Sequence, residues 1–171
     1  MQDFVHLHVH TQYSLLDGQA SVARLVDKAM KNGMKGIAVT DHGNMFGIKE
    51  FTNYVNKKNS GPKGEIKDLK KRIAGIEAGT VECEDKEAEI AACKAKIVEA
   101  ENKLFKPIIG CEMYVARRTM DLKEGKPDQS GYHLIVLAKN EKGYHNLIKL
   151  VSHAWTRGYY MRPRTDRSEL E

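Results

Sequence analysis

Cysteine, proline and long apolar runs are all scarce in this chain, and each scarcity excludes a class of protein. The 3 cysteines form no C-x-x-C pair, which argues against a disulfide framework and against a thiolate zinc finger. With 4 prolines, 41% hydrophobic and 30% charged residues, the composition is that of a globular chain. The longest aliphatic stretch, residues 134–138, is far shorter than the roughly 20 residues that span a bilayer. We therefore expect a cytoplasmic protein without a membrane partner, whose metal ligands, if any, are nitrogen and oxygen atoms.

The length and charge of the chain set further bounds. Its 171 residues are enough for about one domain. The 28 basic and 23 acidic residues give a net charge of +5. This balance permits a polyanionic partner such as a nucleic acid but does not require one.

The first third of the chain alternates between strand and helix patterns. Residues 4–10 alternate strictly, which predicts a strand with three histidines on one face and apolar residues on the other. The apolar spacing over residues 22–30 predicts an amphipathic helix, residues 36–40 a second strand, and residues 46–55 a second helix. This order favours parallel βαβ units and an α/β fold.

A charged insertion follows a polar, glycine-bearing stretch at residues 56–64. Residues 63–106 predict an antiparallel helical hairpin with a turn at residues 78–80. Its narrow apolar seam consists of Ile66, Leu69, Ile73, Ile76, Ile90, Cys93, Ile97 and Leu104. We interpret it as a surface insertion that packs mainly on itself.

The α/β pattern resumes after the insertion. Residues 107–115 and 132–138 predict strands, and a helix is expected from Lys142. Residues 157–167 resemble a loop, and residues 168–171 resemble the start of a helix that is cut short. Roughly four βα units would leave the sheet with an open edge, so we expect a fragment that self-associates.

Histidines and acids cluster at the predicted carboxyl ends of these strands, where sites of parallel α/β folds are built. His8 and His10 end the first strand, Asp41 and His42 end the second, and Asp17 and Glu112 can converge with them. Two histidines at i and i+2 on one strand face can share a divalent ion.

A structural role is the alternative for each of these residues. A single strand histidine is more often a hydrogen-bonded core residue than a ligand, but three unpaired imidazoles side by side would be costly to bury. Asp41 could cap a helix or orient a histidine, and Glu112 could face outward. His133 lies at the start of its strand, remote from the carboxyl ends, and the helix residues His145 and His153 are expected on the surface.

Several motifs together resemble the PHP (polymerase and histidinol phosphatase) superfamily. They are residues 7–11 (LHVHT), Ser14, Asp17-Gly18 and residues 38–43 (AVTDHG). Residues 4–18, 107–110 and 133–139, with 143–147, are similar more narrowly to the N-terminal PHP domains of bacterial replicative DNA polymerases. The resemblance covers nearly the whole chain outside the insertion.

The resemblance implies part of a distorted seven-stranded β/α barrel with up to three metal ions, zinc or manganese, and phosphoesterase or 3′ to 5′ exonuclease chemistry. The implied ligands are His8, His10, Asp17, His42, Glu112 and His133, while His6 and Asp41 would be supporting neighbours. The family's later Asp-x-His motif is absent from this sequence. The magnesium-dependent polymerase domains are absent as well, and these domains, replication subunits and DNA are the implied partners.

Two other functions remain open. The same domain could be a scaffold that stabilises a polymerase and docks a proofreading subunit, or a stand-alone PHP phosphatase. The arginines of residues 157–167, with Tyr159 and Tyr160, could contact nucleic acid or form an ordinary solvated connection.

Overall fold

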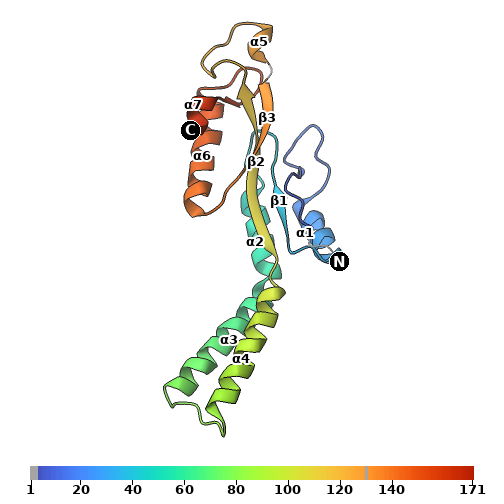
Figure 1. Cartoon of the computed structure of the whole chain (residues 1–171). Coiled ribbons are helices and arrows are strands. Elements are labelled where there is room, and N and C mark those ends of the chain that lie inside the picture. Colours follow the sequence, from blue (N-terminus) through green and yellow to red (C-terminus); the bar gives the residue numbers. More distant parts are fainter. Residues whose placement is uncertain (1–3, 130) are drawn as a thin grey trace. The chain divides into compact units, whose positions relative to one another are not determined.

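The computed structural model describes residues 4–129 and 131–171 (Figure 1). It divides into two compact units, one made of residues up to 53 together with residues from 107 onward, and the other of residues 54–106. None of the helices in these described ranges is both long and apolar enough to cross a membrane.

The first unit begins with the helix and strand that the sequence predicts. Helix α1, Val22–Lys31, begins where the Ser21 side chain accepts a hydrogen bond from the Arg24 N–H, and it buries Val22, Val26 and Ala29. Gly33 follows the helix with φ +77°, a left-handed conformation that glycine adopts without strain. Strand β1, Gly36–Val39, is buried throughout, and helix α2 spans Ile48–Lys58.

The sheet of the first unit is mixed rather than parallel. Strand β2, Lys106–Ala116, lies between β1 and β3, Gly131–Leu137, and it also pairs in parallel with β4, Arg164–Thr165. The β2–β3 pair is antiparallel, so the prediction of parallel βαβ units is wrong there. The connection contains only the short helix α5, Lys126–Gln129, whereas a parallel return needs a full crossover, usually a helix.

The N-terminal segment differs from its prediction as well, because residues 4–10 are not a regular strand. This segment runs beside β1 through two backbone hydrogen bonds, Ala38 N–H to His6 O (2.8 Å) and Thr40 N–H to Val9 O (2.9 Å). The two acceptors, His6 and Val9, are three residues apart, whereas the two donors, Ala38 and Thr40, are only two apart. The N-terminal segment therefore has one extra residue between the hydrogen bonds, as in a β-bulge. The strict alternation of faces is therefore interrupted between His6 and His8.

Strand β2 separates the core from the polar residues. On one face, Cys111 and Met113 pack with Leu147, Val151 and Ala154 of helix α6, Glu141–Thr156. Side chains alternate along a strand, so Glu112 and Tyr114 lie on the opposite face. Figure 1 shows α6 beside the upper part of β2 and β3.

The segment after α6 is more structured than the loop expected for residues 157–167. It contains β4 and leads into helix α7, Arg167–Leu170. Arg164 is fully buried and donates hydrogen bonds to four backbone carbonyls, those of Gly158, Asp128, Met120 and Leu122. The nucleic-acid contact considered for Arg164 is therefore wrong, because its guanidinium is buried and hydrogen-bonded to backbone carbonyls within the protein.

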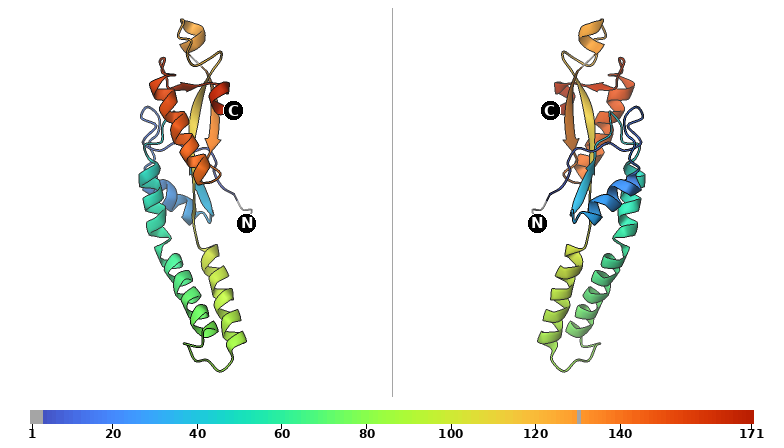
Figure 2. Two further views of the ribbon diagram at one scale, coloured as in Figure 1. Left: turned by 90° about the vertical axis from the view of Figure 1, so that its left-hand side faces the viewer. Right: turned by 90° about the vertical axis from the view of Figure 1, so that its right-hand side faces the viewer.

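The second unit consists largely of helices α3, Ser60–Glu77, and α4, Lys86–Asn102, which pack on each other (Figure 2). The connection covers residues 78–85, longer than the expected turn. Arg72 forms an ion pair with Glu89 (2.8 Å) between the helices. At the base, the buried Asn59 amide donates to Phe105 O (2.8 Å) and accepts from Phe105 N–H (2.9 Å).

Candidate metal centre

The buried carboxylate of Glu112 is the centre of the site, and four imidazoles contact it. One oxygen lies 2.7 Å from His42 Nδ1 and 3.0 Å from His133 Nδ1, and the other lies 3.2 Å from His8 Nε2 and 3.5 Å from His10 Nε2. A backbone bridge between His42 and Glu112, parallel in sense, joins the end of β1 to the middle of β2. The outward orientation considered for Glu112 is therefore wrong.

His8, His10 and Glu112 form a group whose ligand atoms all lie within 4.8 Å of one another. The two Nε2 atoms are 2.9 Å apart, close enough for one ion with bonds of about 2 Å to bind both. Two imidazole nitrogens and a carboxylate oxygen are a donor set that suits zinc and manganese. The residues therefore fit a divalent ion.

Asp17 enters the site from the turn after the N-terminal segment. Its carboxylate lies 3.0 Å from His42 Nε2. Gly18 keeps this turn tight, since a Cβ there would lie 1.9 Å from the carbonyl oxygen of Thr11. The His42 ring in turn stacks on the His10 ring with centroids 4.0 Å apart.

Asp41 is buried and holds the same turn in place. It accepts hydrogen bonds from Thr11 N–H (2.7 Å), Thr11 Oγ1 (2.8 Å) and Ser14 Oγ (2.8 Å). Ser14 Oγ also lies 3.1 Å from His10 Nδ1. Asp41 therefore contacts His10 only through Ser14, and the alternative of a helix cap is wrong because α2 begins at Ile48.

Burial and local contacts shift the pKa values of four side chains in or beside the site. Burial opposes a charged His42, but its hydrogen bonds with Asp17 and Glu112 outweigh burial and raise its pKa. Burial, helped by the neighbouring His42, lowers the pKa of His10. The hydrogen bond to His42 lowers the pKa of the exposed Asp17. Burial raises the pKa of the Cys111 thiol to about 12, so Cys111 stays protonated at neutral pH and is not a candidate ligand.

His133 reaches the site because β3 is antiparallel to β2. It pairs with Tyr114, two residues from Glu112 and on the same face. The alternative in which His133 is remote from the site is therefore wrong, since it assumed a parallel strand. Tyr114 was missed by sequence reasoning, although its position at i+2 from Glu112 indicates a shared face. Its ring stacks on His42 (6.3 Å) and meets His133 edge-on (4.9 Å).

His6 lies outside this group of contacts. Its ring packs edge-on against Phe4 with centroids 4.7 Å apart. The exposed His145 and His153 of α6 are on the surface as expected, and His153 pairs with Glu169.

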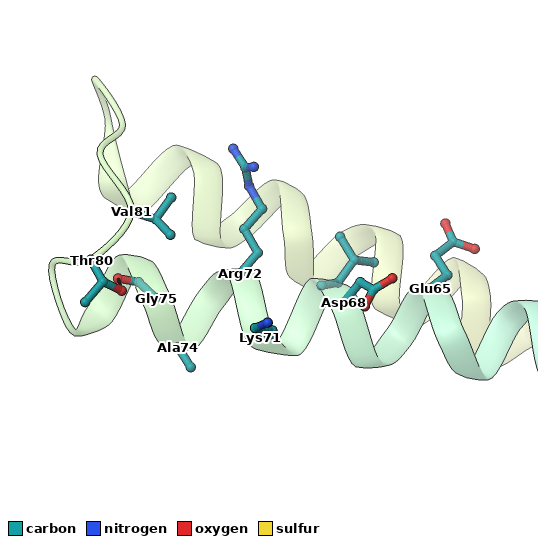
Figure 3. Close-up of a pocket in the computed structure, with 9 residues that line it drawn as sticks. Glu65, Asp68, Lys71, Arg72, Ala74, Gly75, Thr80 and Val81 are labelled. Carbon is teal, nitrogen blue, oxygen red and sulfur yellow. Dashed lines mark hydrogen bonds between the residues drawn. The ribbon is translucent and has the colours of Figure 1, made fainter.

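A cavity of about 1000 Å³ lies in the second unit, along α3 and the connection that follows it (Figure 3). It is lined by Glu65, Asp68, Leu69, Lys71, Arg72, Ala74, Gly75, Thr80 and Val81. No histidine or cysteine is among these lining residues, and five of the nine have charged or polar side chains. It gives no indication of metal chemistry.

The fold and the site define a class of protein: this chain belongs to the PHP domain family, whose profile matches residues 6–171. Its relatives include DNA polymerase III subunit alpha of Borreliella burgdorferi, 41% identical over 171 residues, which cover 98% of this chain and 11% of that protein. The subunit of Treponema pallidum is 40% identical over 164 residues, covering 95% of this chain and 10% of that protein. The subunit of Aquifex aeolicus is 34% identical over 176 residues, covering 99% and 11%. The chain thus spans about a tenth of the length of these relatives.

Proposed function

We propose that this chain is the N-terminal PHP region of a bacterial DNA polymerase III alpha subunit, and that its site hydrolyses a phosphodiester at a DNA 3′ end. The observation that carries the proposal is the buried Glu112 carboxylate in contact with four imidazoles. The similarity to polymerase III alpha subunits supports DNA as the substrate.

The residues proposed to hold zinc or manganese are His8, His10, Asp17, His42, Glu112 and His133. A bound divalent ion would supply positive charge against the phosphate and a Lewis acid for hydrolysis. Glu112 contacts one ring nitrogen of each of its four histidines and so helps to orient them, and Asp17 contacts the remaining nitrogen of His42. Asp41 acts further out by holding Ser14 against His10.

In the longer protein, we propose that the remaining polymerase domains, replication subunits and DNA are the partners, and that magnesium serves the polymerase reaction elsewhere. In the alternative function, the domain is a scaffold that docks a separate proofreading subunit. It would then have the same fold but no hydrolytic activity of its own. The similarity to polymerase subunits favours either of these functions over a stand-alone phosphatase.

Metal content tests the ligand set. The wild-type chain should bind zinc or manganese, with an affinity that falls as pH falls through the imidazole range, because ligation needs neutral nitrogen. The double variant His8→Ala plus His10→Ala should lose at least about tenfold in affinity. His145→Ala, a change of an exposed α6 histidine, is the matched control and should retain the wild-type value. Equal metal content in the double variant and the control would contradict the ligand set.

Hydrolysis tests the activity separately. A single-stranded oligonucleotide labelled at its 5′ end should be shortened from its 3′ end by the metal-loaded chain, and a chelator should stop the reaction. The double histidine variant should be inactive. Metal binding without any shortening, in this chain and in the longer protein, would refute the nuclease and favour the scaffold.

A further inference from the structure

Three aromatic side chains form an exposed strip on the first unit. Trp155 and Tyr159 stack with centroids 5.6 Å apart and an interplanar angle of 20°, and the Phe46 ring lies 6.5 Å from the Trp155 ring. Their exposed fractions are 63% for Phe46, 43% for Trp155 and 48% for Tyr159. We call these three residues the aromatic strip. Large apolar rings left exposed in a row often mark a binding surface.

The aromatic strip begins next to the candidate metal centre. Trp155 Nε1 donates a hydrogen bond to the carbonyl oxygen of Gly43 (2.8 Å), which directly follows His42. The Gly43 N–H donates to the carbonyl of Glu112 (2.8 Å). Gly43 has φ +59°, and a Cβ there would lie 2.7 Å from Pro163, so this junction is tightly constrained. The strip is thus fixed to the backbone of two proposed ligands.

A cation lies at the same end of the strip. The Arg162 guanidinium lies 4.8 Å from the centre of the Tyr114 ring and donates to Tyr114 Oη (2.8 Å). Tyr114 in turn stacks on His42. Within the part of the chain that the structure describes, no carboxylate pairs with Arg162, which leaves its positive charge for an anion.

We propose that the aromatic strip binds successive bases of single-stranded DNA whose 3′ end lies in the metal centre, while Arg162 contacts a backbone phosphate. This inference rests on the proposed function and names the surface that would guide its substrate. Flat rings near the Arg162 guanidinium match a polymer of flat bases and phosphates, because any base can stack on an aromatic ring whatever its sequence. The net charge of +5 is compatible with such a polyanionic partner.

Trp155 is the only tryptophan of the chain, so its fluorescence reports directly on the strip. Oligothymidylate titrated into the 171-residue chain in the presence of a chelator should quench this fluorescence. Phe46→Leu and Tyr159→Leu keep an apolar side chain but remove the aromatic face, and each should weaken binding about tenfold. Arg162→Met should reduce the dependence of binding on salt, because one phosphate contact is lost.

Tyr132→Leu is the matched control, because Tyr132 is equally exposed (62%) but lies on β3 and contacts Arg117. It should bind the oligonucleotide like the wild type. Three results would each overturn the proposal: absence of quenching, affinities of the Phe46 and Tyr159 variants equal to that of the control, or equal binding of a blunt duplex. The chelator prevents hydrolysis, so this experiment measures binding alone. If DNA quenches the fluorescence but the metal-loaded chain does not cleave DNA, the proposed nuclease activity is rejected and DNA binding by the aromatic strip is supported.

Discussion

At the scale of single residues, Glu112 favours the charged form of His42. Its hydrogen bond is one of two that raise the pKa of His42 against the effect of burial. In the metal-free chain, a charged His42 therefore adds stability below its unfolded pKa, and this contribution is lost as pH rises through the raised folded pKa.

The substitution Glu112→Gln should lower the pKa of His42, because only the charge of Asp17 and the hydrogen bond that His42 donates to it would then oppose burial. NMR titration of the imidazole in the presence of a chelator measures this change. Glu169→Gln is the control: its carboxylate contacts His153 instead, so the His42 titration should not move. A His42 pKa unchanged by the loss of Glu112 would contradict the observed contact.

Arg164 stabilises the fold through buried hydrogen bonds. Four carbonyls from residues 120–128 and 158 accept hydrogen bonds from it. Arg164→Met should lower the free energy of unfolding by about 3 kcal/mol or more, because several buried carbonyls lose their donor. Urea unfolding measures the effect.

The control for that experiment is Arg167→Met, which removes an exposed arginine paired with Glu171. It should change the free energy of unfolding by no more than about 0.5 kcal/mol. Similar losses in both variants would show that positive charge, rather than the buried hydrogen bonds of Arg164, stabilises the fold.

These residues also show how far the sequence alone predicts the site. Motif spacing and resemblance pointed to His8, His10, His42 and Glu112, which the structure brings together. The burial of Arg164 could not be foreseen, because its partners are loop carbonyls up to 44 residues away in sequence. The periodicity of apolar residues in the sequence does not indicate such a contact.

At the scale of elements, hydrophobic periodicity predicted α1, β1 and α6 well, because each buries one regular face. It could not predict the direction of β3, since side chains alternate in the same way in parallel and antiparallel strands. It also missed the interruption in residues 4–10, where two widely spaced hydrogen bonds replace a regular ladder.

The β2–β3 pair is sensitive to a single methyl group. A Cβ on Gly131 would lie 2.1 Å from the carbonyl oxygen of Val115. Gly131→Ala should therefore push the start of β3 away from β2, lower the free energy of unfolding by roughly 1–3 kcal/mol and weaken metal binding through His133. Thermal unfolding and metal titration measure the two effects.

Gly64→Ala is the opposite case, because nothing lies within 4 Å of a Cβ at this position in helix α3. Alanine is a better helix former, so this variant should gain up to about 1 kcal/mol in stability. If both variants shifted the melting temperature in the same direction, the close approach at Gly131 would not be the cause.

At the scale of the whole molecule, β3 pairs along one edge with β2, and in the described ranges no strand covers its other edge. Tyr132 and Leu134 are exposed on this strand. We expect the 171-residue chain to self-associate through this edge, so that its melting temperature rises with protein concentration. Sedimentation and melting over a concentration series measure both.

A variant in which a Gly-Ser linker replaces residues 63–102 serves as the comparison. It should melt with the same concentration dependence, because the edge belongs to the other unit. A strictly monomeric wild-type chain would refute the prediction for the edge, and loss of a cooperative melt in the variant would show that the helices support the sheet.

The paired hydrogen bonds between Asn59 and Phe105 have a consequence for protein engineering. The Asn59 side chain bonds both backbone groups of Phe105, 46 positions later in the sequence, and so holds the two ends of the helical segment together. The entropy of closing such a segment rises only slowly with its length. We therefore expect that helices α3 and α4 can be replaced by another segment. A reporter domain inserted at residues 78–85 should leave the sheet of the first unit folded.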